Sequence, residues 1–206
     1  MKRFIAGLVS LVIVSGAAFA KTWTNYIGVG LGVPVESVES KDSDKIVQAG
    51  VVLDAAYTGV HSNGFTVKAG FDSGAVASDD VKIQGDDMNS ATFVAFNLGA
   101  GYSFVQTEKV LFGTTAMFTG AFNMYEEKTE HGGKDYTDSV VVGAFGMGAD
   151  VFGVCNIGNH FGFYANLGLR YIFDGVVQAE VAGNKADSDV KGNVLVLPSL
   201  GVIWHF

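Results

Sequence analysis

Six charged side chains lie inside segments whose residues otherwise alternate between large apolar types and small or polar types. They are Asp54, Lys68, Asp72, Asp150, Arg170 and Asp174. Each falls on the small, polar side of its segment, so the alternation directs all six towards one interior. An unpaired buried charge is costly, and four carboxylates share this interior with one lysine and one arginine. We therefore predict a lumen charge network of ion pairs and hydrogen bonds, with negative charge left over.

Two functions fit such an interior. The interpretation that we favour is a hydrogen-bonded network that largely fills the interior and specifies its shape, and His205 is placed to join it at one rim. The alternative is a narrow, cation-leaning conduit, because abundant interior glycines would leave room for water. A charged lining tunes selectivity only where a path exists.

Signals for catalysis are weaker. The four histidines are scattered along the chain: His61, His131, His160 and His205. Their spacing gives no cluster of serine, histidine and acid. The glycine-rich stretches 28–32 and 143–146 resemble nucleotide loops in composition, but each lies in a predicted strand with no helix after it. We expect no enzyme activity and no cofactor.

Metal binding and disulfide formation are also not expected. Acidic residues within 42–44, 79–80 and 187–189 offer oxygen ligands for calcium, yet they lack the full spacing of an EF-hand loop. Solvated surface loops are the better interpretation of these runs. Cys155 is the only cysteine, so no disulfide can form within the chain.

Eight segments alternate with period two, as β-strands do. They span residues 22–35, 46–60, 65–72, 92–104, 110–123, 141–151, 161–174 and 192–206. In the clearest, 161–174, Phe163 and Leu167 lie on one face, and Gly162 and Asn166 lie on the other. The opposite faces are too small and polar to form the core of a soluble protein. The large residues are therefore expected to contact lipid.

Connections between these strands alternate in length. Short connections near 61–64, 106–108 and 155–160 alternate with long polar ones near 36–45, 77–90, 125–138 and 175–191. Strands of ~10 residues in even number, with short turns at one end and long loops at the other, are typical of outer-membrane barrels. We predict an all-β, eight-stranded antiparallel up-and-down transmembrane β-barrel with both termini in the periplasm. A soluble lipocalin-like barrel is the rival fold, and it would reverse the two faces.

Residues 1–20 are predicted to be a cleaved secretory signal peptide, which leaves 21–206 for the barrel. Lys2 and Arg3 precede the apolar stretch 4–14, and 18–20 matches a small-x-small cleavage site. That stretch is far shorter than the ~20 residues that a membrane-spanning helix needs.

The C-terminal segment carries a resemblance to a known family. Ser199, Gly201, Trp204 and Phe206 match the C-terminal pattern of outer-membrane barrels, which the barrel-assembly machinery reads in that family. The chain resembles the small eight-stranded group that includes OmpX, the OmpA membrane domain and OmpW. It is also similar to treponemal outer-membrane barrels. The resemblance is one of architecture, and it implies an outer-membrane location.

Charge narrows the choice of partners. Without Lys2 and Arg3, 21 acidic residues face 11 basic ones (13 minus 2), a net charge of −10 (11 minus 21). This argues against nucleic-acid binding, which needs a basic surface. Most acidic residues fall in the long loops, so we expect a monomer in outer-membrane lipid whose loops are open to a host or extracellular ligand.

The expected role is surface interaction or envelope integrity. The alternative is a narrow channel for small solutes, ions or small hydrophobic compounds, with which OmpW-like barrels are linked. Several apolar residues interrupt the polar face and would line such a channel: Tyr26, Val52, Leu195, Leu197 and Ile203.

Overall fold

A computed structural model describes residues 22–40, 46–77, 82–83, 86–87, 90–131, 134–181 and 184–206. The strands of its main sheet are β1 (Trp23–Gly32), β2 (Val35–Ser40), β3 (Ile46–His61), β4 (Phe65–Ala77), β7 (Ser90–Gln106), β8 (Val110–His131), β9 (Lys134–Asn156), β10 (Phe161–Ile172), β11 (Gly175–Val181) and β12 (Asn184–His205). A separate short pair consists of β5 (Lys82–Ile83) and β6 (Asp86–Asp87). The predicted signal peptide, 1–20, lies outside the described residues.

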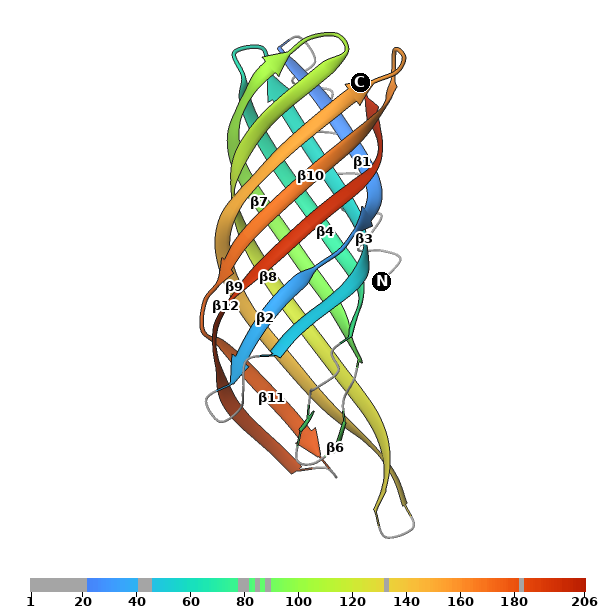
Figure 1. Ribbon diagram of the computed structural model, residues 1–206, viewed down its shortest axis with the longest axis vertical. Coiled ribbons are helices and arrows are strands. Elements are labelled where there is room, and N and C mark those ends of the chain that lie inside the picture. Colours follow the sequence, from blue (N-terminus) through green and yellow to red (C-terminus); the bar gives the residue numbers. More distant parts are fainter. Residues whose placement is uncertain are drawn as a thin grey trace.

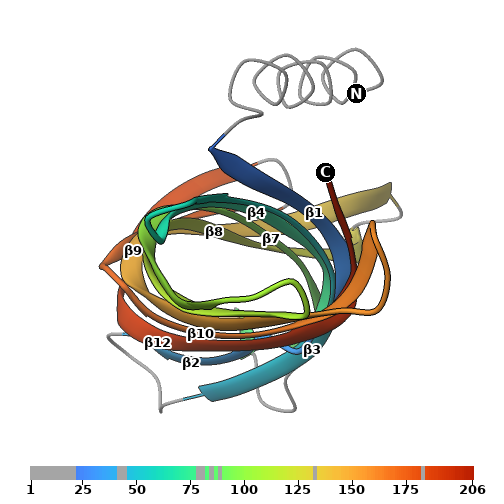
Figure 2. The ribbon, with the colours of Figure 1, turned by 90° about the horizontal axis from the view of Figure 1, so that it is seen from above.

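These strands form a closed barrel, as predicted. Its wall has eight antiparallel members, which we call staves, and a stave consists of one strand or of two strands in line. Neighbours in the chain are neighbours in the wall, and β1 closes the ring by pairing with both β12 and β3. Two staves consist of two strands each, β1 with β2 and β10 with β11. Figure 2 shows the ring along its axis. Closure leaves no free sheet edge around the wall, which is the condition for a sheet to cross a bilayer.

Pro34 explains why the first stave is divided. Proline has no backbone N–H to donate to a ladder. The register nevertheless runs through it, because Gly32 pairs with Ser199 and Val35 with Val196. The Pro34 carbonyl still accepts a hydrogen bond from the Gly50 N–H (3.0 Å). The first stave therefore continues beyond its division.

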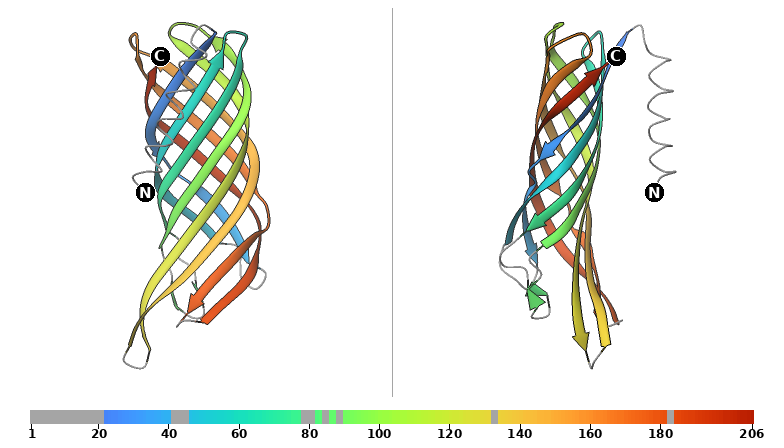
Figure 3. Two further views of the ribbon diagram at one scale, coloured as in Figure 1. Left: turned by 180° about the vertical axis from the view of Figure 1, so that it is seen from behind. Right: turned by 90° about the vertical axis from the view of Figure 1, so that its right-hand side faces the viewer.

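The two ends of the barrel differ. The short-turn end, at the top of Figure 1, carries the turns near 62–64, 107–109 and 157–160 and the C-terminus. At Gly64 the backbone takes a φ of 96°, a conformation that glycine adopts without strain. At the opposite end, β8 and β9 project well beyond the rest of the wall (Figures 1 and 3). We call this the hairpin end.

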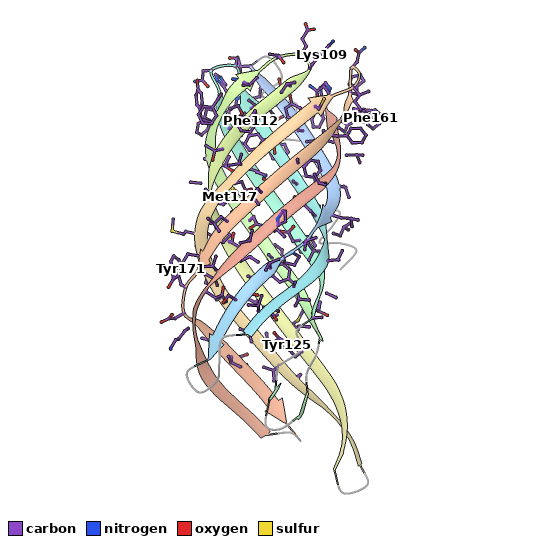
Figure 4. All side chains as sticks on the ribbon, viewed as in Figure 1. Lys109, Phe112, Met117, Tyr125, Phe161 and Tyr171 are labelled. Atoms are coloured by element: carbon purple, nitrogen blue, oxygen red, sulfur yellow. The ribbon has the colours of Figure 1, made fainter. Side chains whose placement is uncertain are left out.

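Side chains alternate across the wall as the sequence predicts. Leu98 is 67% exposed on the outer face, whereas Phe93 is fully buried inside the barrel. The outer face is apolar along the wall, and Figure 4 shows Phe112 and Phe161 near the short-turn end and Tyr171 nearer the hairpin end. Among the described residues, no helix could span a membrane.

The structure corrects three predicted loops. Residues 125–138 and 175–191 are predicted to be long loops, but their described parts continue the β8–β9 and β11–β12 hairpins. Residues 36–40 belong to β2 rather than to a loop. Beyond the membrane both faces of a strand meet water, so the alternation of apolar residues ends there. The backbone pairing of the strands continues past this point.

Candidate functional site

Asp150 is the centre of the polar interior. From β9, its carboxylate accepts a hydrogen bond from Lys68 Nζ on β4 (Oδ2, 2.6 Å) and forms an ion pair with the Arg170 guanidinium on β10. All three side chains are buried. Lys68 and Asp150 belong to strands separated in the wall by β7 and β8, so their ion pair crosses the lumen.

Both cations make further contacts. Lys68 Nζ donates to Asn166 Oδ1 (2.6 Å) and lies 5.6 Å from the centre of the Phe152 ring. Arg170 Nε donates to Thr119 Oγ1 (2.9 Å), and its Nη1 donates to the Ala149 carbonyl (2.8 Å). These bonds satisfy much of the donor capacity of both groups, which lowers the cost of burying them.

The network continues from Arg170 to a second carboxylate. Thr119 Oγ1 donates to Asn97 Oδ1 (2.7 Å), and Asn97 Nδ2 donates to Asp72 Oδ2 (2.8 Å). A continuous chain of polar contacts thus links β4, β7, β8, β10 and β9. We call this chain the charge layer, and it includes four of the six predicted network residues.

Asp54 lies beside the charge layer. It pairs in register with Asp72 on the neighbouring strand and accepts a hydrogen bond from Tyr164 Oη (3.1 Å). The Tyr164 ring lies over three glycines, since a Cβ on Gly28 would stand 2.9 Å from it and one on Gly30 or Gly201 would also collide with the side chain. Small residues on β1 and β12 thereby make room for an aromatic side chain that reaches along the inner wall from β10 to Asp54 on β3.

Two apolar clusters flank the charge layer within the barrel. One consists of Val52, Val76, Ala91, Phe93, Ala95, Ala121, Tyr125, Val140, Ile172, Leu195 and Leu197. The other consists of Tyr26, Val60, Leu111, Phe152, Val154, Tyr164 and Ile203. The five apolar residues expected to interrupt the polar face all lie in these clusters. They pack against other side chains, so they are part of two interior cores.

A second polar group lies around Glu36, a residue that the sequence pattern assigns to a loop. Glu36 is 3% exposed. Its carboxylate accepts hydrogen bonds from Gln48 Nε2 (2.8 Å), Asn123 Nδ2 (3.0 Å) and Asn193 Nδ2 (2.8 Å). Tyr125 Oη donates to Gln48 Oε1 (2.8 Å), which extends the group. The signal was present in the sequence: continuing the inward phase of Gly28, Gly30 and Gly32 past Pro34 leads to Glu36.

Asp174 is not part of the lumen charge network, contrary to the prediction. It lies in the short connection between β10 and β11, where its side chain is exposed. Its Oδ1 accepts a hydrogen bond from the Gly192 N–H (2.8 Å). The strand ends at Ile172, so the alternation no longer determines where the side chain of Asp174 points.

The predicted assembly-signal residues lie on the last strand and at its end. Ser199 and Gly201 face the interior, and Trp204 is exposed on the outer wall. Phe206 exchanges two backbone hydrogen bonds with Asn25: its N–H donates to the Asn25 carbonyl (3.0 Å) and its carbonyl accepts from the Asn25 N–H (3.2 Å). These bonds join the two ends of the barrel sequence.

The residues considered for calcium are not described well enough to test the prediction. Residues 42–44 and 79–80 lie outside the described residues, and so do the side chains of 187–189. Within the described part of the chain, no three histidine, cysteine or acidic side chains cluster to hold a metal ion. Cys155 is a free thiol and exposed.

Comparison with known proteins identifies the architecture. No protein-family model and no curated protein sequence matches the chain. The outer membrane protein OprG of Pseudomonas aeruginosa aligns over 90% of this chain and 97% of its own, with a TM-score of 0.56 and 10% identity. A major outer membrane protein of Thermus thermophilus aligns over 87% of this chain and 99% of its own (TM-score 0.49, 15% identity). Neisserial surface protein A covers 87% and 97% (TM-score 0.48, 12% identity). At 10% identity, the likeness to OprG shows a shared fold.

Proposed function

We propose that the protein is an integral outer-membrane β-barrel with a largely filled interior, and that it acts in surface interaction or envelope integrity. In this proposal the barrel is a rigid monomeric scaffold, and the acidic segments at the hairpin end face outwards towards a host or extracellular ligand. The chain is exported through its N-terminal signal and inserted by the barrel-assembly machinery. No catalytic step is assigned to it.

The charge layer is the observation that carries this proposal. Polar contacts run from Asp72 to Asp150 and Lys68 across the lumen, and apolar clusters pack on both sides of them. A small barrel whose side chains meet in this way leaves little space for solute along its axis. Fully hydrogen-bonded polar networks also rigidify the structures that contain them.

Current measurements in planar lipid bilayers test the proposal. The purified full chain should insert, as judged by its heat-modifiable migration in gels, without giving reproducible conductance steps. The Tyr164→Ala variant is the positive control, because it removes the ring that lies over Gly28, Gly30 and Gly201, and it should raise the current. Reproducible, ion-selective steps from the unmodified protein would overturn the filled-interior proposal.

A narrow, cation-leaning channel for small solutes or ions is the second candidate. Asp54 and Asp72 face the interior side by side, and among the described residues neither forms a salt bridge with a lysine or arginine. Such a pair would attract cations if water reached it. In that case Asp72→Asn should lower cation selectivity in the same bilayer measurement, while Asp174→Asn, at the exposed turn, should leave it unchanged.

A further inference from the structure

The two tryptophans of the chain occupy matching positions on the strands that close the barrel. Trp23 begins β1 and Trp204 lies near the end of β12, and these two strands pair with each other. Both residues are at the short-turn end. Each one contacts a histidine and a phenylalanine from the strands or turn on its other side, so the two groups flank the closing seam.

The group around Trp204 is tightly stacked. The His160 ring lies parallel to the indole, with centroids 5.3 Å apart and planes inclined by 7°. Phe161 meets the same indole edge-on, at 4.4 Å and 84°. His160 comes from the turn before β10, the strand that pairs with β12. The indole therefore holds an imidazole at the rim of the barrel.

The group around Trp23 repeats the arrangement on the other side of the seam. Trp23 pairs with His61 across β1 and β3, and their ring centroids are 5.2 Å apart at an interplanar angle of 71°. Phe65, at the start of β4, lies 6.0 Å from Trp23 at 81°. We call the two sets, Trp23–His61–Phe65 and Trp204–His160–Phe161, the rim triads.

Both rim triads lie on the lipid-facing side of the wall. Phe161 is 58% exposed and Trp204 is 42% exposed, and the side chains of Trp23 and His61 point outwards in the phase of their strands. Figure 4 shows Phe161 at the outer edge of the short-turn end. Tryptophan at this depth is typical of the interface between hydrocarbon and headgroups. Two imidazoles are thereby placed among lipid headgroups.

Hydrogen bonds orient both imidazoles. His160 Nδ1 is 3.3 Å from the His205 carbonyl, which accepts only, so Nδ1 is the donor. His61 Nδ1 is 2.8 Å from Asn63 Oδ1, and it donates to this oxygen in the protonated ring, although the Asn63 N–H also approaches the same nitrogen (3.3 Å). Among the described residues, neither Nε2 has a hydrogen-bond partner. In the imidazolium form, the Nε2 proton can therefore be donated to an anionic oxygen of a ligand.

We propose that the rim triads are binding sites for the phosphate of anionic phospholipids, with phosphatidylglycerol as the model ligand. The imidazolium Nε2–H donates to the phosphate, and in the Trp204 triad the face of the indole lies parallel to the His160 ring and stabilises its cation. Among the described residues, His205 is the other titratable side chain in ring contact with a triad, with its ring centroid 6.2 Å from that of His160. The proposal rests on the proposed membrane orientation, in which the short-turn end faces the periplasmic leaflet.

Lipid-specific quenching of tryptophan fluorescence tests this proposal, because both tryptophans belong to the triads. The full chain is folded into vesicles of equal parts phosphatidylglycerol and phosphatidylcholine. Bromine is placed on the acyl chains of one lipid class or of the other, at the same carbons, so that membrane composition stays constant. At pH 5.5, brominated phosphatidylglycerol should quench more strongly, corresponding to a roughly two- to fivefold local enrichment. At pH 8 the difference should disappear.

Variants assign the effect to the histidines. In the double variant His61→Phe with His160→Phe, the two brominated lipids should quench equally, while total quenching stays the same because tryptophan depth is unchanged. His131→Phe, at the hairpin end of β8, is the matched control and should behave as the unmodified protein. The Trp23→Phe variant reports the Trp204 triad alone.

The negative charge of the protein separates local binding of anionic lipid from general electrostatic attraction. With a net charge of −8 for the full chain, general electrostatics predicts depletion of anionic lipid, so enrichment must come from local contacts. Equal quenching in the unmodified protein, or enrichment that survives the double variant, would overturn the proposal. Failure of the proposed membrane location looks different, because the protein would then not insert and brominated lipid would not quench it at all; failure of the filled interior would appear as conductance steps and would leave the quenching unchanged.

Discussion

Asp150 is the carboxylate that pairs with both buried cations of the charge layer. It bonds both Lys68 and Arg170, and through Arg170 it reaches Thr119, Asn97 and Asp72. Removing one partner of a buried ion pair is more damaging than the value of the pair, because the other charge is left without compensation. Removal of the Asp150 carboxylate would leave two buried cations, Lys68 and Arg170, without their acidic partner.

The Asp150→Ala substitution should therefore destabilise the barrel by about 3–5 kcal/mol. Urea unfolding in detergent micelles, followed by tryptophan emission, measures this change. Asp174→Ala is the matched control: that side chain is exposed and accepts a single backbone hydrogen bond, so the expected change is below about 1 kcal/mol. Equal unfolding midpoints for the two variants would contradict the assigned role of Asp150.

At the scale of elements, glycines determine how closely strands and side chains approach. A Cβ on Gly201 would collide with the Val29 carbonyl and the Tyr164 ring, whereas one on Gly158 in a turn would meet nothing within 4 Å. Replacement of glycine by alanine therefore meets nearby atoms at Gly201 and open space at Gly158.

Gly201→Ala should destabilise the barrel by about 1–3 kcal/mol through overpacking, and Gly158→Ala should be nearly neutral. Thermal unfolding monitored by gel mobility of heated samples compares them. A neutral Gly201→Ala variant would show that Tyr164 can move away, and the filled interior would lose one of its supports.

The projecting β8–β9 hairpin is an element that the barrel does not need for closure. Within the described part of the chain, the two strands pair only with each other beyond Glu126 and Ser139. Replacing residues 127–138 by an Asn-Gly turn should leave the folded fraction intact and change stability by less than about 1 kcal/mol. Gel mobility of the refolded variant checks this, and loss of the folded band would contradict it.

Strand phase was predictable from the sequence, and strand length was not. In the membrane, lipid on one side enforces alternation, so the pattern alone directs Leu167 outwards and Asn166 inwards. Past the membrane that constraint ends, and only backbone pairing maintains the hairpin beyond Glu126. The first predicted strand stops just after Pro34, although the register passes through this residue and turns Glu36 inwards.

At the scale of the whole molecule, the partners inside the network could not be predicted. Lys68 and Asp150 are 82 residues apart and approach across the lumen, so their contact depends on the stagger accumulated around the ring. Of the six charges that the sequence directs to one interior, five are buried there and Asp174 is not. The sequence does not indicate that Asp150 has two cations while Asp54 has a tyrosine.

Assembly also belongs to this scale. If the C-terminal residues are the recognition signal, Phe206→Ala should reduce the assembled fraction in cells several-fold. Refolding of the same variant into detergent in vitro should be little changed, because the Asn25 pairing uses backbone atoms only. Fractionation of outer membranes measures the first result and gel mobility the second. Equal losses in both would indicate a folding defect instead of a recognition defect.

The pairing of β1 with β12, which the Asn25–Phe206 bonds extend, imposes an order on biogenesis. The first and last strands of the barrel must meet, so the ring cannot close before β12 has been synthesised. A chain that stops before β12 would keep two unpaired sheet edges, and hydrocarbon cannot form hydrogen bonds with their backbone groups. Such products should therefore be absent from the outer-membrane fraction.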